Sequence, residues 1–118
     1  MANRRRGEVG LRLGDERYTL CLTLGGLAEL EDRFGVADLA ALGERLAGGK
    51  LGARDVVALL AVGLRGGGHD LDEREVASLP VAGEIEAVIG AVVEMLAAAF
   101  GVDGGGEGGP QNPPRPGP

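Results

Sequence analysis

The chain has 118 residues, a net charge of −6 at pH 7, and few aromatic side chains, with no Trp, one Tyr and two Phe. Nucleic-acid binding relies on Lys and Arg against phosphate and, for single strands, on bases stacked on aromatic rings, so this composition argues against it. The single cysteine excludes an intramolecular disulfide. No run of about 18 apolar residues is present, so we expect no membrane span.

The first seven residues are polar and basic, and we expect a flexible arm over residues 1–7. Arg4, Arg5 and Arg6 stand in a row there, but Gly7, Glu8 and Val9 follow instead of a continuous apolar run. This order argues against a secretory signal peptide, and with a single cysteine in the chain a reducing, cytoplasmic location is the simpler expectation. Three arginines in an acidic chain are also too few for a nucleic-acid interface.

Alternating apolar residues predict a β-hairpin over residues 8–24. The first strand, over residues 8–13, has apolar side chains at every second position: Val9, Leu11 and Leu13. Residues 14–16 predict a turn. The second strand is expected over residues 17–24, with one apolar face made of Tyr18, Leu20, Leu22 and Leu24. A lone hairpin is marginal in water, so we expect helices or another chain to cover this face.

A first amphipathic helix begins after Thr23, whose hydroxyl can accept from the free N–H groups of the first turn. Apolar side chains then recur at helical spacing, at Leu27, Leu30 and Phe34. Gly35 is expected to end the helix in the left-handed conformation. The charged residues Glu29, Asp32 and Arg33 point away from the apolar stripe, so we expect that face to lie in water.

Two further helices are predicted in the middle of the chain. Asp38 can cap the first of them, which has a narrow apolar stripe and stops at Gly48 and Gly49; the stripe is Leu39, Leu42 and Leu46. The next, over about residues 53–65, has apolar side chains on more than one face: Val56, Val57, Leu59, Leu60, Val62 and Leu64. It is either the central helix of a bundle or one that shows its second face to a partner.

Two more helices complete the predicted domain. Asp72 and Glu75 have the spacing of a capping box and open a short helix that ends before Pro80. The last helix, over about residues 83–100, is almost entirely apolar. From residue 101 to 118 the chain is rich in Gly and Pro, which predicts disorder. The sequence thus predicts a mainly α, α+β domain over residues 8–100, a hairpin followed by a bundle of four to five helices.

No residue grouping typical of catalysis or metal binding is found. Phosphate-binding glycine loops normally follow a strand and bring Lys and Ser or Thr, whereas Gly66-Gly67-Gly68 follows a helix, so we interpret it as a turn. His69, Asp70 and Asp72 could ligate a metal, but His69 is the only histidine and Asp72 is better explained as a helix cap. No spacing brings Cys21 to a base. We therefore expect neither an enzyme nor a cofactor.

The surplus of apolar surface on the third and last helices is the sharper functional signal. One interpretation is that the two helices bury these side chains against each other, because a small domain needs every apolar residue for its core. The other is that part of the surface receives an apolar helix of another protein. The residues predicted to bind such a partner are Val56, Leu60, Leu64, Val88, Val92 and Leu96.

Several stretches resemble one known protein family. They are residues 22–31 with Phe34 and Gly35, and residues 63–69, in a region of similarity that covers about residues 3–101. The family comprises small phage-derived tail proteins of gene transfer agent clusters in alphaproteobacteria, described both as tail tube proteins and as chaperone-like tail assembly proteins. Gly52 departs from the family pattern, since a capping Ser is expected there. The Gly/Pro tail lies outside the resemblance.

The resemblance implies a role in building a phage-like tail. Chaperones of this class are thought to coat the apolar helices of the tape-measure protein and to help tail-tube subunits polymerise around it. The implied partners are thus the tape-measure and tail-tube proteins, with self-association also open. Two alternatives remain: a structural tube subunit that adds strands edge to edge, and a small enzyme, which the missing catalytic grouping disfavours.

Overall fold

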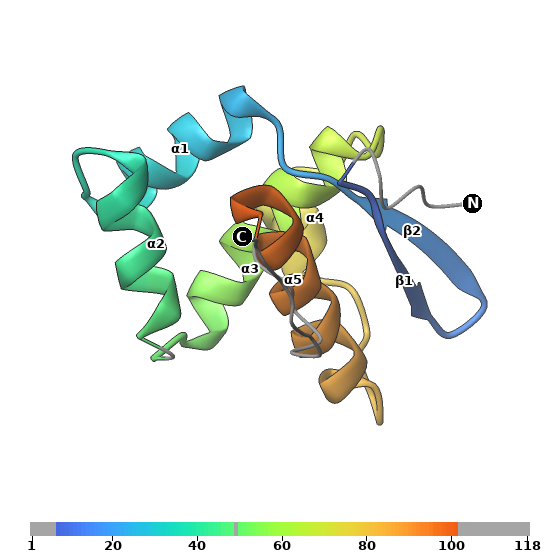
Figure 1. Cartoon of the computed structure of the whole chain (residues 1–118). Helices are drawn as coiled ribbons and strands as arrows, with labels where there is room; N and C mark the ends of the chain where they lie inside the picture. The colour runs from blue at the N-terminus through green and yellow to red at the C-terminus, as the bar shows by residue number, and fades with distance from the viewer. Residues whose placement is uncertain (1–6, 49, 102–118) are drawn as a thin grey trace, which may run out of the picture.

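The computed structural model describes residues 7–48 and 50–101, in which a β-hairpin is followed by five α-helices (Figure 1). The elements are β1 (Val9–Leu13), β2 (Glu16–Leu20), α1 (Leu24–Phe34), α2 (Leu39–Ala47), α3 (Ala53–Gly66), α4 (Glu73–Ala77) and α5 (Ile85–Phe100). This arrangement confirms the predicted fold class. Nearly all of the predicted flexible arm and disordered tail lies outside the described residues.

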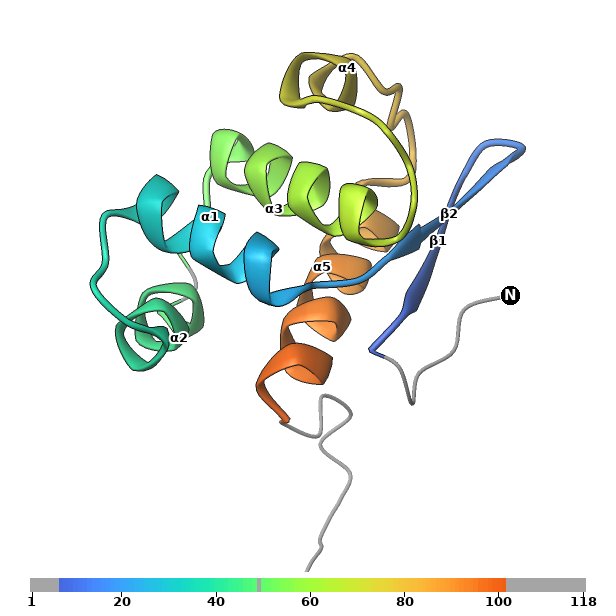
Figure 2. The ribbon, with the colours of Figure 1, turned by 90° about the horizontal axis from the view of Figure 1, so that it is seen from above.

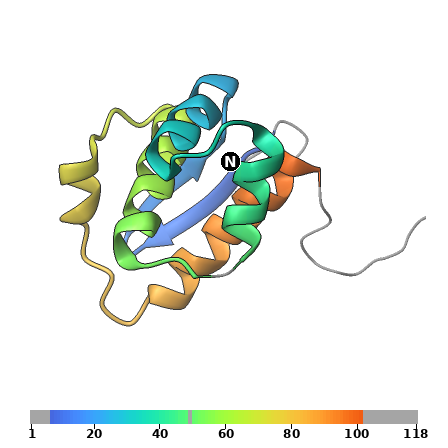
Figure 3. The same cartoon turned by 90° about the vertical axis from the view of Figure 1, so that its left-hand side faces the viewer.

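The hairpin packs one face on the helices. Val9, Leu11 and Leu13 are buried, whereas Gly10 and Arg12 between them are exposed, as the alternation predicts. The two strands are antiparallel, in a register that places Val9 opposite Leu20. On the packed face, β1 contacts α5 and β2 contacts α3. Figure 3, viewed from the side of α1 and α2, shows the strands behind these helices.

The second strand ends earlier than predicted. It stops at Leu20, because the N–H of Cys21 donates to the carbonyl of Gly63 in α3 and so leaves the hairpin. Leu24, which we expected on the apolar face of the strand, is instead the first residue of α1 and is 80% exposed. Thr23 caps this helix with an extended backbone, the conformation that a strand residue also has. The apolar alternation of the strand therefore continues in the sequence past the point where the helix begins.

The predicted helix ends are largely confirmed. The Thr23 hydroxyl accepts from the N–H of Gly26, and the Asp38 carboxylate accepts from that of Ala41. Asp72 and Glu75 form the reciprocal bonds of a capping box. Gly35 ends α1 with a φ of 67°.

Helix α3 is the centre of the bundle. Every residue from Ala58 to Leu64 is buried, which removes the alternative of a second face open to a partner along this stretch. Figure 2 shows α1, α4 and α5 around it, and all three contact it. The charged residues Glu29, Asp32 and Arg33 of α1 are exposed, as predicted, and two of them form ion pairs with other helices. Glu29 pairs with Arg65 of α3 at 2.8 Å, and Arg33 with Glu73 of α4 at 2.7 Å.

The glycine triplet at the end of α3 packs closely against the backbone of the hairpin. A methyl group on Gly66 would overlap the carbonyl oxygen of Cys21, and one on Gly67 would overlap that of Thr19. The helix end therefore lies directly against the backbone of β2 and the link that follows it. His69, just beyond, accepts the N–H of Thr19 at its Nε2 at 2.9 Å. Our interpretation of the triplet as a turn is thus correct for its position, but its glycines are needed for close approach.

Replacing Thr23 with alanine tests whether the cap of α1 stabilises the fold. We expect a loss of about 1 kcal/mol in the free energy of unfolding, because the N–H of Gly26 loses its acceptor. Urea denaturation measures this change. Thr23→Ser keeps the hydroxyl and should stay close to the original stability; equal stability of all three proteins would show that the cap contributes nothing.

Candidate functional site

The helix bundle buries most of the residues that we predicted to bind a partner. Leu60, Leu64, Val88 and Val92 are 5% exposed or less and belong to the core. Val56 and Leu96 are partly buried. A partner helix could reach the four core residues only if the bundle opened, so the surface available to it must lie elsewhere. The binding role of this set stays a prediction.

Helix α5 has a second apolar face beside its core face. Its core face is made of Val88, Ala91, Val92 and Met95. One step around the helix, apolar side chains recur at intervals of three or four residues, which places them in one stripe: Ile85, Ile89, Val93, Leu96 and Phe100. The first three of these are exposed. We call this row the outer stripe of α5.

The C-terminal part of the outer stripe, from Val93 to Phe100, lines an open apolar cleft between α2 and α5. The cleft has a volume of about 710 Å³, within the range of pockets that take a ligand or several side chains. Its lining includes Leu39, Gly43, Leu46, Val93, Leu96 and Phe100. Across the cleft, the ring of Phe100 lies 3.6 Å from where a Cβ on Gly43 would be, which is an ordinary van der Waals distance. Helix α2 and the end of α5 thus approach closely at this point.

The charges around the cleft are unevenly placed. Glu44 lines the cleft and is exposed. The neighbouring Arg45 is held elsewhere, because its guanidinium lies 4.9 Å from the ring centre of Phe34 and 3.7 Å from the Asp55 carboxylate. The apolar floor therefore has an acidic group at its edge. Such a surface suits a helix that has apolar side chains flanked by a basic one.

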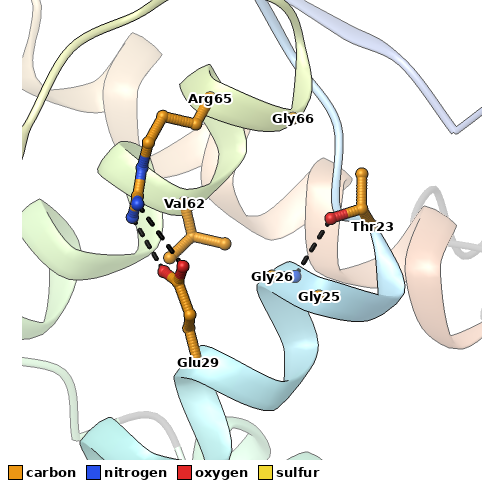
Figure 4. A pocket seen from close by; sticks show the side chains of 7 residues that line it. All are labelled: Thr23, Gly25, Gly26, Glu29, Val62, Arg65 and Gly66. Carbon is orange, nitrogen blue, oxygen red and sulfur yellow. Dashed lines mark hydrogen bonds and ion pairs between the residues drawn. The ribbon is translucent and has the colours of Figure 1, made fainter.

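A second, smaller pocket lies between the start of α1 and the end of α3 (Figure 4). It measures about 320 Å³. The polar side chains in it already have partners: Thr23 caps α1, and Arg65 pairs with Glu29. Gly26 lies so close to Val62 that a Cβ there would come within 2.6 Å of its methyl group. We interpret this pocket as part of the joint between the two helices, since its polar groups are occupied.

The residues considered for metal binding or catalysis have structural roles. His69 accepts a backbone hydrogen bond and its ring lies edge-on to that of Tyr18, with 5.3 Å between centres. Asp72 caps α4. Within residues 7–48 and 50–101, no group of three or more His, Cys, Asp or Glu side chains is placed to hold a metal. In the same residues, no helix combines the length and apolarity needed to cross a membrane.

The cleft residues that sequence reasoning did not assign to a partner include Leu39, Val93 and Phe100. The signal was present, because α5 is apolar on more than one face. The sequence could not show which face of α5 packs on α3. Of the α5 residues that we assigned to a partner, Val88 and Val92 lie in the core, whereas Leu96 lines the cleft. Leu39 was expected in the narrow apolar stripe of α2, yet it is exposed and lines the cleft.

Comparison with known protein families gives a match over almost the whole described chain. A family described as "Phage tail tube protein, GTA-gp10" matches residues 6–102. This region contains the hairpin, all five helices of the described residues and the cleft between α2 and α5. Searches of curated proteins and of solved structures found no match.

Proposed function

Because the chain belongs to the phage tail tube protein, GTA-gp10, family, we propose that it acts in assembly of a gene transfer agent tail as a chaperone for the tape-measure protein. In this proposal, the cleft between α2 and α5 holds an apolar helix of the tape-measure protein until tail-tube subunits replace it. The role is binding, with no chemical step, and it takes place in the cytoplasm while particles form.

The observation that supports this proposal is the open apolar cleft. Val88, Val92 and Met95 supply the core face of α5, whereas Ile85, Ile89 and Val93 of the outer stripe are exposed. Exposed apolar side chains that line a cleft are typical of a surface for protein partners. A helix laid in the cleft would cover Val93 and Leu39 and place a basic residue near Glu44.

Co-expression tests the proposal. The full chain is produced together with the long coiled-coil protein of its gene cluster, and the soluble fraction is separated by size exclusion. We expect the two proteins to elute as one complex, and the long protein to be insoluble when expressed alone. Separate elution of two soluble proteins would overturn the proposal.

The second candidate is a structural subunit of the tail tube, which the family description favours. Such a subunit would polymerise by strand addition, and the only sheet in residues 7–48 and 50–101 has two strands. The composition of finished particles distinguishes the candidates, because a chaperone leaves the particle and a subunit stays.

A further inference from the structure

The outer stripe of α5 continues beyond the cleft between α2 and α5. Its C-terminal part, from Val93 to Phe100, lines the cleft, whereas Ile85 and Ile89 do not. Both isoleucines are nevertheless exposed, to 53% and 43%, and they lie on the same side of the helix as Val93. Ile85 and Ile89 thus continue the apolar surface by about two turns towards the N-terminus of α5. We call these two residues the extension of the cleft.

A carboxylate lies at each end of this apolar row. Glu44 lines the cleft, and its neighbour Gly43 lies close to the ring of Phe100, so Glu44 marks the Phe100 end. Glu86 marks the other end, because it precedes Val93 by seven residues, and residues seven apart lie almost in line along a helix. Both carboxylates are exposed, and within residues 7–48 and 50–101 neither is paired with a cation. The row therefore has an unpaired acidic residue at both ends.

We propose that the cleft and its extension form one continuous binding surface for a partner helix of about four turns, with a Lys or Arg near each end of its apolar stripe. This inference rests on the proposed function and specifies the helix that it requires. At about 1.5 Å per residue, Glu86 lies about 21 Å along the helix from the level of Phe100, so the two basic residues should be about 14 residues apart. Between them, the apolar residues of the partner cover Ile85, Ile89 and Val93.

The charges disfavour a second copy of this chain as the occupant. Helix α5 has no Lys or Arg, so a second α5 would bring no cation to Glu86 or Glu44. The only basic residue of α2 is Arg45, which is held by Phe34 and Asp55. The net charge of −6 also makes two copies repel each other. A basic amphipathic helix of another protein is the occupant that fits both the apolar row and its acidic ends.

Titration calorimetry of the full chain with a designed peptide tests the extension. The peptide is an amphipathic helix of about four turns, with Leu at helical spacing and a Lys at each end. We expect Ile89→Asp to weaken binding about tenfold, because the bound helix would bury the new carboxylate among apolar side chains. Ala87→Asp is the matched control, since Ala87 is also exposed on α5 but lies two residues from Ile89, on another face. It should leave the affinity unchanged.

A charge swap tests the acidic ends. Glu86 is exposed, so the fold tolerates its replacement by lysine. Glu86→Lys should weaken binding of the Lys peptide about fivefold, because an attraction becomes a repulsion. A second peptide, with Glu in place of Lys at one end, should recover the affinity for Glu86→Lys. The same peptide should bind the original chain more weakly than the Lys peptide does.

Val93→Asp, in the cleft itself, separates this inference from the proposed function. The inference is overturned if Ile89→Asp binds as well as Ala87→Asp, if Glu86→Lys does not distinguish the two peptides, or if the original chain does not bind the Lys peptide. Weaker binding by Val93→Asp alone would leave the proposed role of the cleft in place. No effect of Val93→Asp on binding would contradict the proposed function as well.

Discussion

Replacing Gly66 with alanine is expected to lower the free energy of unfolding by about 3 kcal/mol or more. The added methyl would overlap the carbonyl oxygen of Cys21, a backbone atom that cannot rotate away as a side chain does. Relief requires the end of α3 to separate from the link after β2, which also weakens the bond from Cys21 to Gly63. For a domain of this size, whose total stability is about 5–15 kcal/mol, this is a large fraction. Urea denaturation measures it.

Gly90→Ala is the matched control for this change. Gly90 lies within α5, is exposed, and has nothing within 4 Å of an added Cβ. The same substitution there should stabilise the protein by about 0.5–1 kcal/mol, because alanine favours the helix. Opposite signs at the two positions are the expected result. A Gly66→Ala protein as stable as the original would contradict the close packing of α3 on the strand.

Replacing Val93 with aspartate is expected to weaken binding of the tape-measure helix at least tenfold. Val93 lies in the wall of the cleft and is 50% exposed in the free protein, so the fold tolerates the change. Bound helix would bury the new carboxylate among apolar side chains, which costs free energy without a partner charge. Each factor of ten in affinity corresponds to about 1.4 kcal/mol. Titration calorimetry with a peptide of the tape-measure protein gives the affinity.

Leu24→Asp provides the control for the cleft. Leu24 is also an exposed apolar residue, but it lies in the first turn of α1, outside the cleft. An aspartate there is favourable at a helix N-terminus, so we expect neither stability nor affinity to fall. If both variants weakened binding equally, or if neither did, the partner would not lie between α2 and α5.

The sequence was sufficient to predict most of the fold, because local signals set the element ends. Thr23, Asp38 and Asp72 cap their helices as expected, and the alternation in β1 gives its buried face. The end of β2 was wrong, since the alternation continues through Leu24 although the chain has already turned away. What ends the strand is a bond from Cys21 to α3, a long-range contact that no local pattern encodes.

The binding surface was predicted less well. The sequence indicated that α5 has more apolar surface than one core face needs, and the structure contains an open cleft along it. The sequence alone could not show which of two neighbouring apolar rows on α5 faces the core. One row runs through Val88 and Val92, and the other, of similar hydrophobicity, runs through Ile89 and Val93. Only the packing of α5 on β1 and α3 decides between them. The role of Gly66 and Gly67 was likewise hidden, because glycine at a turn and glycine at a close contact look alike in sequence.

Mass spectrometry of purified particles tests the central proposal most directly. If the protein is a tail assembly chaperone, finished particles contain the tape-measure protein and the tube subunits, and lack this chain, while lysates in which assembly is under way contain it bound to the tape-measure protein. Presence of this chain in finished particles, in fixed proportion to the other tail proteins, would contradict the chaperone role and establish it as a structural subunit.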